Sequence, residues 1–250
     1  LLWVIGNAYK LLIDYQLGAE ALAYLGLALM LAFSLAGAVE SLALQVFHAP
    51  FYKSITTANS IEERAKAFQT LIDDAVPIIS GAVFVLIACT PYLLTILTDA
   101  RFSSISIFFS LALILELIRI YTNLLGHAAH SEYKTSQNIG PYLLGAITVL
   151  IGLPVALTMD SWEYAVILTL FVGWFVSLVW MIRTARKILN FTFPFKQLFK
   201  IIVFLLPVFL ISFLLKDNAD SSAFSLFFLG IIGGVSATII FKYYSSRNPA

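Results

Sequence analysis

Charged residues are scarce in this 250-residue chain. They make up 12% of it, with 15 basic and 14 acidic side chains, where about a quarter is usual in a soluble protein. Apolar residues make up 60%, and the mean hydropathy is +0.93. A water-soluble fold of this length has too few charged side chains to cover so many apolar ones. Lipid must therefore be the solvent for much of the chain.

Cysteine, basic runs and catalytic motifs are also scarce or missing. The single cysteine, Cys89, forms no intrachain disulfide and cannot build a thiolate metal site. A net charge of +1 without a basic run excludes a surface that follows nucleic-acid phosphates. The chain has no phosphate-binding glycine motif, no zinc-protease motif and no nucleophile elbow. No loop is long enough to form an aqueous catalytic domain, so we do not expect the chain to be an enzyme. We also expect that it has no cofactor and no nucleic-acid partner.

Long apolar runs are present instead, and they recur along the whole chain. Most approach or exceed the length that spans a hydrocarbon core, and the shorter ones can extend into their flanks. The runs are Ala21–Phe47, Ile72–Leu97, Ile105–Gly126, Tyr142–Thr158, Tyr164–Met181, Leu198–Leu215 and Phe224–Tyr243. Together with a shorter stretch at the start, they predict an all-α, polytopic transmembrane helix bundle of about eight segments.

The stretch at the start, Leu1–Ile13, is too short to cross about 30 Å of hydrocarbon at 1.5 Å per residue. It has no basic region ahead of it and no small-residue cleavage site after it, so it does not resemble a signal peptide. The simplest interpretation is that Leu1 lies inside a truncated transmembrane helix. The sequence is then the C-terminal part of a longer protein.

The basic residues alternate between connections, and this alternation predicts the orientation. Eleven lie in every second connection and at the C-terminus, whereas only Arg101 and Lys216 lie in the other connections. The eleven are Lys53, Arg64, Lys66, Lys134, Arg183, Arg186, Lys187, Lys196, Lys200, Lys242 and Arg247. By the positive-inside rule, the side with eleven cations, which includes the C-terminus, faces the cytoplasm.

One connection and several prolines give local expectations. Ser60 and Glu63 have the capping-box spacing, which predicts an amphipathic helix lying at the cytoplasmic interface and running into the next span. Pro50 is expected at a helix end. Pro91 falls inside the run Ile72–Leu97 and is expected to kink it.

Three ionisable residues stand out well inside the predicted spans, where each costs about 2.5–3.5 kcal/mol to insert. Glu116 and Arg119 are three residues apart, so they share a helix face and can pair. Such a pair either locks helix packing or lines a cavity that meets an anionic or sugar-bearing substrate or an ion. Glu40 has no cation in its own helix, so it needs a water-filled cavity or a partner from another helix. It is a candidate for binding a proton or Na⁺.

Other polar residues carry weaker signals. Lys10 is expected to extend toward the membrane surface, and Asn7, Gln45 and Asn123 are candidates for hydrogen bonds between helices. His127 and His130 have a spacing that can chelate a metal, but no further ligand completes a set. These histidines, like His48, are interpreted as interfacial.

Several stretches carry a family resemblance. Asp14–Gly26 leads through Leu17-Gly18 into a helix of small residues, which Ala49–Tyr52 leaves with a proline and an aromatic residue. Leu97–Phe102 and, after an apolar helix, His130–Lys134 suggest the next hairpin. These stretches resemble the second half of bacterial polysaccharide flippases, within the superfamily that also holds multidrug exporters. The resemblance covers most of residues 1–190.

The resemblance implies two six-helix lobes around a cavity that opens alternately to either side. Residues 1–190 would form the C-terminal lobe with its first helix truncated, and 191–250 two additional transmembrane helices and a short cytoplasmic tail. The implied function is translocation of a lipid-linked oligosaccharide, a polysaccharide precursor, across the bacterial cytoplasmic membrane. The implied partners are membrane lipid, that oligosaccharide, Na⁺ or H⁺, and a glycan polymerase or glycosyltransferase.

Other functions remain open on the sequence. One is a cation-coupled multidrug exporter of the same superfamily. Another is a polytopic membrane acyltransferase or sugar polymerase, with His127 or His130 in catalysis. A third is a membrane scaffold without catalytic activity.

Overall fold

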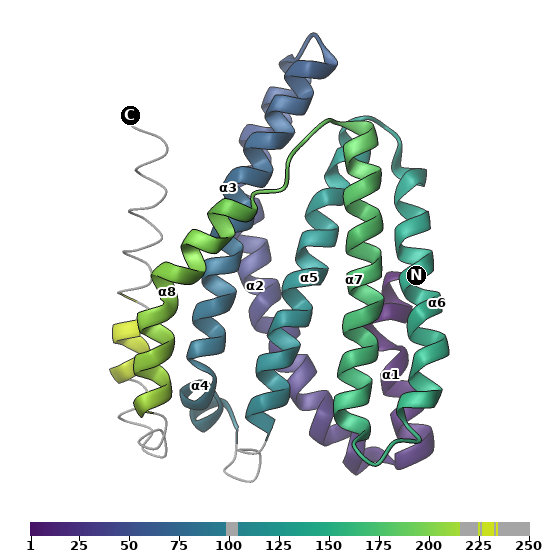
Figure 1. Cartoon of the computed structure of the whole chain (residues 1–250), viewed down its shortest axis with the longest axis vertical. Helices are drawn as coiled ribbons and strands as arrows, with labels where there is room; N and C mark the ends of the chain where they lie inside the picture. The colour runs from purple at the N-terminus through teal and green to yellow at the C-terminus, as the bar shows by residue number, and fades with distance from the viewer. Residues whose placement is uncertain (99–104, 216–224, 226, 233, 235–250) are drawn as a thin grey trace.

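The computed structural model of the chain describes residues 1–98, 105–215, 225, 227–232 and 234. All regular structure in these residues is helical, which confirms the predicted all-α fold class (Figure 1). The elements are α1 (Leu2–Leu17), α2 (Ala19–Thr57), α3 (Ile61–Ala88), α4 (Thr90–Leu97), α5 (Ser106–Ser131), η2 (Thr135–Asn138), α6 (Ile139–Ala156), α7 (Trp162–Ile188) and α8 (Phe195–Leu215).

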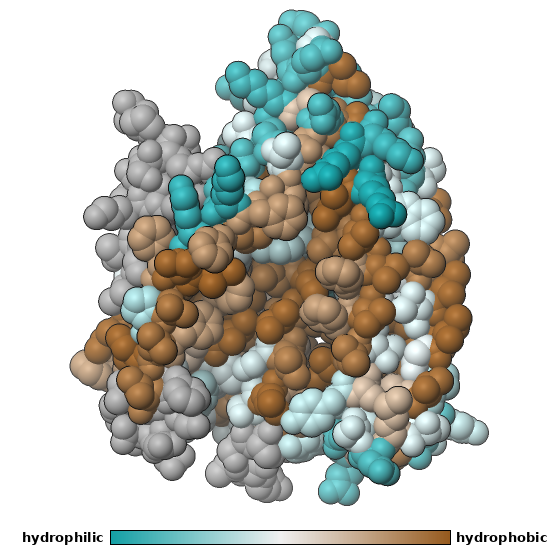
Figure 2. All heavy atoms as spheres, viewed as in Figure 1, coloured by the Kyte–Doolittle hydropathy of each residue, from teal (hydrophilic) through white to brown (hydrophobic). Residues whose placement is uncertain are grey.

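Six of these helices are long and apolar enough to cross a membrane. They are Ala19–Thr57, Ile61–Ala88, Ser106–Ser131, Thr135–Ala156, Trp162–Ile188 and Phe195–Ser212. Figure 2 shows a predominantly apolar surface across the middle of the visible face, with hydrophilic side chains gathered toward its ends. Of the two other expected segments, α1 has only 16 residues, and Phe224–Tyr243 lies largely outside the described residues.

Charge separates between the two ends of the bundle. The connections α2–α3, α5–α6 and α7–α8 lie at the upper end in Figure 1, and the described cations of the predicted cytoplasmic side lie in or beside them. The turns α1–α2 and α6–α7 lie at the lower end and are flanked by Asp14, Glu20, Asp160 and Glu163. The alternation predicted from the sequence is therefore present in the fold. The predicted contributions of Arg101, Lys216, Lys242 and Arg247 lie outside the described residues.

Glycine 18 lets the chain reverse between α1 and α2. It has a φ of +88°, in the region that glycine adopts without a steric penalty. Its amide donates to the carbonyl oxygens of Ile13 and Asp14 and so closes the end of α1. Ile5 and Ile13 of α1 are fully buried. The short first helix is therefore packed into the bundle, where it contacts α2, α6 and α7.

The α2–α3 hairpin begins its second helix where the capping-box spacing predicts. The Glu63 amide donates to Ser60 Oγ at 3.2 Å, and the Asn59 amide donates to the Glu63 carboxylate at 2.7 Å. The expected amphipathic helix and the following span form one unbroken α3, which rises together with the end of α2 past the upper ends of α5, α6 and α7 (Figure 1). The expectation for Pro50 was wrong, because α2 continues through it to Thr57.

The expected span Ile72–Leu97 is divided at Cys89, between α3 and α4. Pro91 stands in the first turn of α4, where its missing amide hydrogen costs little, so it starts a helix there instead of kinking one. α8 packs across this break. The Ser212 hydroxyl donates to the Ala88 carbonyl, and the Tyr92 hydroxyl donates to the Ser212 carbonyl at 3.1 Å.

Helix α5 lies at the centre of the bundle and contacts α2, α3 and α7. Most of its residues are buried, including Glu116. Helices α6 and α7 pack closely through two glycines: a Cβ added at Gly145 would lie 2.8 Å from the Gly173 carbonyl oxygen. The Ser177 hydroxyl, in the same contact, donates to the Pro141 carbonyl at 3.0 Å. Close backbone approach at small residues is how membrane helices gain packing energy without a hydrophobic driving force.

Candidate functional site

One face of α5 is polar over most of its length. Its members recur three or four residues apart, so they lie on the same side of the helix. They are Glu116, Arg119, Asn123, His127 and His130. Arg119, Asn123 and His127 contact polar side chains of α2, which runs beside α5. Two apolar helices thus meet along a seam that is partly hydrophilic.

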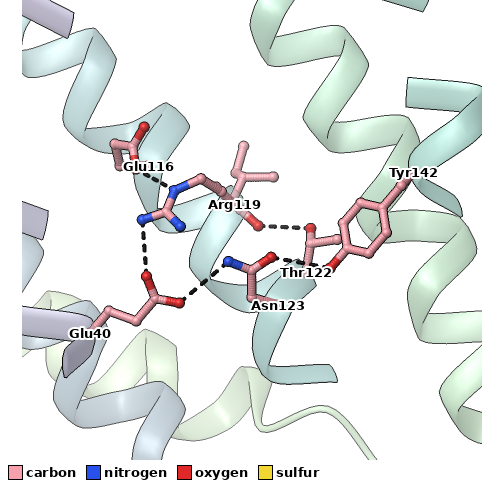
Figure 3. Close-up of polar contacts among 7 residues, drawn as sticks. Glu40, Glu116, Arg119, Thr122, Asn123 and Tyr142 are labelled. Atoms are coloured by element: carbon pink, nitrogen blue, oxygen red, sulfur yellow. Dashed lines mark hydrogen bonds and ion pairs between the residues drawn. The ribbon is translucent and has the colours of Figure 1, made fainter. Parts of the chain in front are cut away.

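Arg119 is the centre of this seam. Its guanidinium donates from Nε to Glu116 Oε2 at 2.5 Å and from Nη2 to Glu40 Oε2 at 2.9 Å. Glu116 is one turn away on the same helix, whereas Glu40 reaches across from α2 (Figure 3). All three ionisable residues predicted from the sequence therefore form one ion cluster. Of the two alternatives predicted for Glu40, a water-filled cavity or a partner from another helix, Arg119 supplies the second.

Two further side chains extend the ion cluster to α6. Asn123 Nδ2 donates to Glu40 Oε1 at 3.4 Å, and the Tyr142 hydroxyl donates to Asn123 Oδ1 at 3.1 Å (Figure 3). The Asn123 side-chain amide therefore donates from its nitrogen to a carboxylate and accepts at its oxygen from a hydroxyl. The chain of contacts joins α2, α5 and α6, and each helix contributes a polar group within its span.

The side chains of the ion cluster are mostly, but not completely, buried. The side chains of Glu116, Arg119 and Glu40 are 8%, 13% and 15% exposed. The guanidinium carbon of Arg119 also lies 5.1 Å from the ring centroid of Phe33, a cation–π distance. When all three groups are ionised, two carboxylates face one guanidinium, so the cluster carries a net charge of −1.

A cavity of about 300 Å³ opens beside the ion cluster. Residues of α1, α2, α5 and α7 line it, among them Asn7, Lys10, Phe33, Glu116, Arg119 and Trp174. Its lining is therefore apolar for the most part, with a few charged and amide groups. Lys10, which is exposed, lines the same cavity as Arg119.

The sequence analysis did not identify Tyr142 as part of this site. Tyr142 stands in an apolar run where an aromatic residue carries no signal of a polar contact. The weaker candidates divide: Asn123 makes the predicted hydrogen bond between helices, Asn7 lines the cavity, and Gln45 is exposed.

The histidines form a second polar contact nearer the upper end of α2 and α5. His48 Nε2 and His127 Nε2 are 3.1 Å apart, and the Tyr52 hydroxyl lies 3.3 Å from His127 Nδ1. Within the part of the chain that the structure describes, no group of three or more His, Cys, Asp or Glu side chains is placed to hold a metal ion. The weak metal signal of His127 and His130 therefore has no preformed centre behind it.

Comparisons with protein-family models, with curated proteins and with solved structures find no match. The resemblance to polysaccharide flippases therefore stays a prediction that rests on the stretches quoted above. What the fold establishes, over the residues that the structure describes, is a helical bundle with six helices long and apolar enough to cross a membrane, and an ion cluster within them.

Proposed function

We propose that this chain is part of a membrane transporter that moves the polar headgroup of a lipid-linked oligosaccharide across the bilayer by alternating access. A sugar pyrophosphate cannot enter hydrocarbon unaided, so the protein must supply a polar path while the lipid tail stays in the membrane. The ion cluster of Glu40, Glu116 and Arg119 beside a 300 Å³ cavity is the observation that supports this proposal.

Arg119 serves in this proposal as the group that meets phosphate. Arginine binds phosphate with two parallel donors, and Arg119 already offers its donors to two carboxylates. An anionic headgroup must therefore compete with Glu40 or Glu116 for the guanidinium. Since Glu40 belongs to α2 and Arg119 to α5, such an exchange loosens one helix from the other. That is how substrate binding would favour a second arrangement of the bundle.

The charge balance of the ion cluster favours a second candidate, a cation-coupled multidrug exporter. Two carboxylates against one guanidinium leave a net negative charge within the membrane, which attracts Na⁺, H⁺ or a cationic drug. Lys10, on the wall of the same cavity, offsets this charge and favours the anionic headgroup. The two functions differ in the sign of charge that the cavity accepts.

The test is transport by the purified chain reconstituted in vesicles of bacterial phospholipid. A fluorescent lipid-linked oligosaccharide in the vesicles reports translocation through its accessibility to an external lectin. Wild-type protein should accelerate translocation, and Arg119→Gln should slow it at least tenfold. Arg183→Gln, which removes an exposed arginine at the end of α7, is the matched control and should leave the rate unchanged.

Circular dichroism and melting curves check that each variant is folded. Arg119→Lys keeps the positive charge and gives a second route if Arg119→Gln does not fold. It should also transport more slowly, because an ammonium group lacks the planar fork. Translocation at the wild-type rate by a folded Arg119→Gln protein would remove Arg119 from the mechanism. Export of a cationic dye with no oligosaccharide translocation would support the exporter instead.

A further inference from the structure

The contact between His48 and His127 has a hydrogen-bonding pattern that differs from an ordinary packing contact. Each histidine comes from a different helix, and their ring centroids are 4.4 Å apart at an interplanar angle of 77°. The two Nε2 atoms face each other at 3.1 Å, which is hydrogen-bond distance. One nitrogen must donate and the other must accept, so exactly one hydrogen lies between them.

Tyr52 supports one pattern in which both rings are neutral. Its hydroxyl, 3.3 Å from His127 Nδ1, can donate to that nitrogen. His127 then carries its hydrogen on Nε2 and donates it to His48 Nε2. His48 carries its own hydrogen on Nδ1. His48 Nε2 and both ring nitrogens of His127 are then paired without any ring being charged.

The same geometry also accepts one added proton. If the proton joins His127 at Nδ1, that nitrogen donates to the Tyr52 oxygen, whose hydroxyl hydrogen turns away. His127 Nε2–H still donates to His48 Nε2. The hydrogen between the two rings can pass to His48, which transfers the positive charge to α2 without breaking the contact. The contact therefore holds one positive charge that the two helices share.

A second added proton does not fit. Both Nε2 atoms would then carry hydrogens that point at each other across 3.1 Å, and both rings would be positive. His130, whose ring centroid lies 5.9 Å from that of His127, would add a third positive charge on protonation. Like charges at this distance disfavour the doubly charged pair. The rings must separate before the second proton binds.

We propose that His48, His127 and Tyr52 form a proton-binding site that joins α2 to α5, holds one shared proton and opens when a second proton binds. The ligand of this site is H⁺ itself. The site is distinct from the ion cluster around Arg119, which lies further along the same two helices. It does not depend on the transported substrate, so it stands or falls separately from the proposed function.

Other charged and titratable groups surround this site on the elements packed against α2 and α5. Arg64 of α3 forms a two-bond ion pair with Glu132, with Nε 2.6 Å from Oε1 and Nη2 3.3 Å from Oε2. The two charges of this pair therefore largely compensate each other. Arg119 is likewise held by its two carboxylates. The 3₁₀ helix η2 carries no titratable side chain. Other ionisable groups on these elements include Lys10 of α1, Lys53 of α2, Tyr142 of α6 and Arg183 of α7, and α3 also carries Glu62, Glu63, Lys66, Asp73 and Asp74.

The test exploits the fact that the chain has three histidines. The full chain, labelled with ¹⁵N in the imidazole rings and reconstituted in lipid nanodiscs, is titrated between pH 8 and pH 4 by NMR. Imidazole nitrogen shifts report the tautomer and charge of each ring. We expect His48 and His127 to titrate as a pair in two steps at least about one pH unit apart.

Variants assign the steps and supply the controls. His127→Gln should convert the titration of His48 to a single step, and His48→Gln should do the same for His127. His130→Gln should leave the two steps of the pair separate. If one variant does not fold, the reciprocal variant and the wild-type titration still decide the question. Single-step titration of His48 and His127 with equal midpoints, unchanged when either partner is replaced, would overturn the proposal.

Discussion

The guanidinium of Arg119 on α5 lies 2.9 Å from the carboxylate of Glu40 on α2, across 79 residues of sequence. This contact turns two costly intramembrane charges into a link between helices. Because Arg119 also holds Glu116 at 2.5 Å, the link is one part of a three-residue ion cluster. Removing Arg119 leaves both carboxylates without a cation, in surroundings that disfavour their charge.

Neutralising Arg119 should destabilise the fold through the carboxylates that it leaves behind. Arg119→Gln leaves Glu40 and Glu116 without their cation, and we expect a loss of about 3–5 kcal/mol. The triple variant Glu40→Gln/Glu116→Gln/Arg119→Gln leaves no unpaired charge and should recover most of that loss. Thermal or denaturant unfolding in nanodiscs measures both. Arg183→Gln is the control, since this exposed arginine should contribute little.

The interpretation depends on the order of these stabilities. If Arg119→Gln unfolds at the same point as Arg183→Gln, the ion cluster contributes nothing to the fold. If the triple variant is no more stable than Arg119→Gln, the loss comes from packing of the arginine stem and not from unpaired carboxylates.

The close contact of α6 and α7 should tolerate no side chain at Gly145. A Cβ there would overlap the Ser177 hydroxyl and lie 2.8 Å from the Gly173 carbonyl oxygen. Gly145→Ala should therefore cost about 1–3 kcal/mol by forcing the two helices apart. Gly37→Ala is the matched control within another span, because no atom lies within 4 Å of its added Cβ. It should be neutral or stabilising by about 0.5–1 kcal/mol. Equal unfolding midpoints for the two variants would contradict this close packing.

The segment between α7 and α8 should depend on Gln69 of α3. The Thr192 amide donates to Gln69 Oε1 at 2.7 Å, and Gln69 Nε2 donates back to the Thr192 carbonyl at 3.0 Å. Gln69→Ala removes both bonds, each contributing about 1 kcal/mol, so hydrogen exchange at the Thr192 amide should accelerate roughly tenfold or more. Gln137→Ala, in the exposed turn η2, is the control. Unchanged exchange at Thr192 would show that Gln69 does not hold this segment.

Part of the ion cluster could be predicted because it is local. Glu116 and Arg119 are three residues apart, and helical geometry alone brings them together. Ser60 and Glu63 define the start of α3 for the same reason. In both cases a short spacing and a helical period are enough, and no knowledge of neighbouring helices is needed.

The partners that lie far apart in the sequence could not be predicted. Glu40, Asn123 and Tyr142 meet because α2, α5 and α6 have particular rotations about their axes and particular shifts along them. The same holds for His48 and His127, which the sequence analysis interpreted as separate interfacial residues. A hydropathy pattern indicates which residues lie in a span. It says little about how the helix is rotated about its axis within the bundle.

The amino-acid composition and the apolar runs were enough to predict a bundle of membrane-spanning helices. Charged residues are scarce and the apolar runs are long, so lipid must be the solvent. The sequence also determined the segregation of cations to one end of the bundle. Two features became visible only in the folded chain. Arg119 binds two carboxylates at once, and α8 packs against the boundary between α3 and α4. These features depend on packing between helices, where small residues and polar contacts, and not overall hydrophobicity, select one arrangement among many.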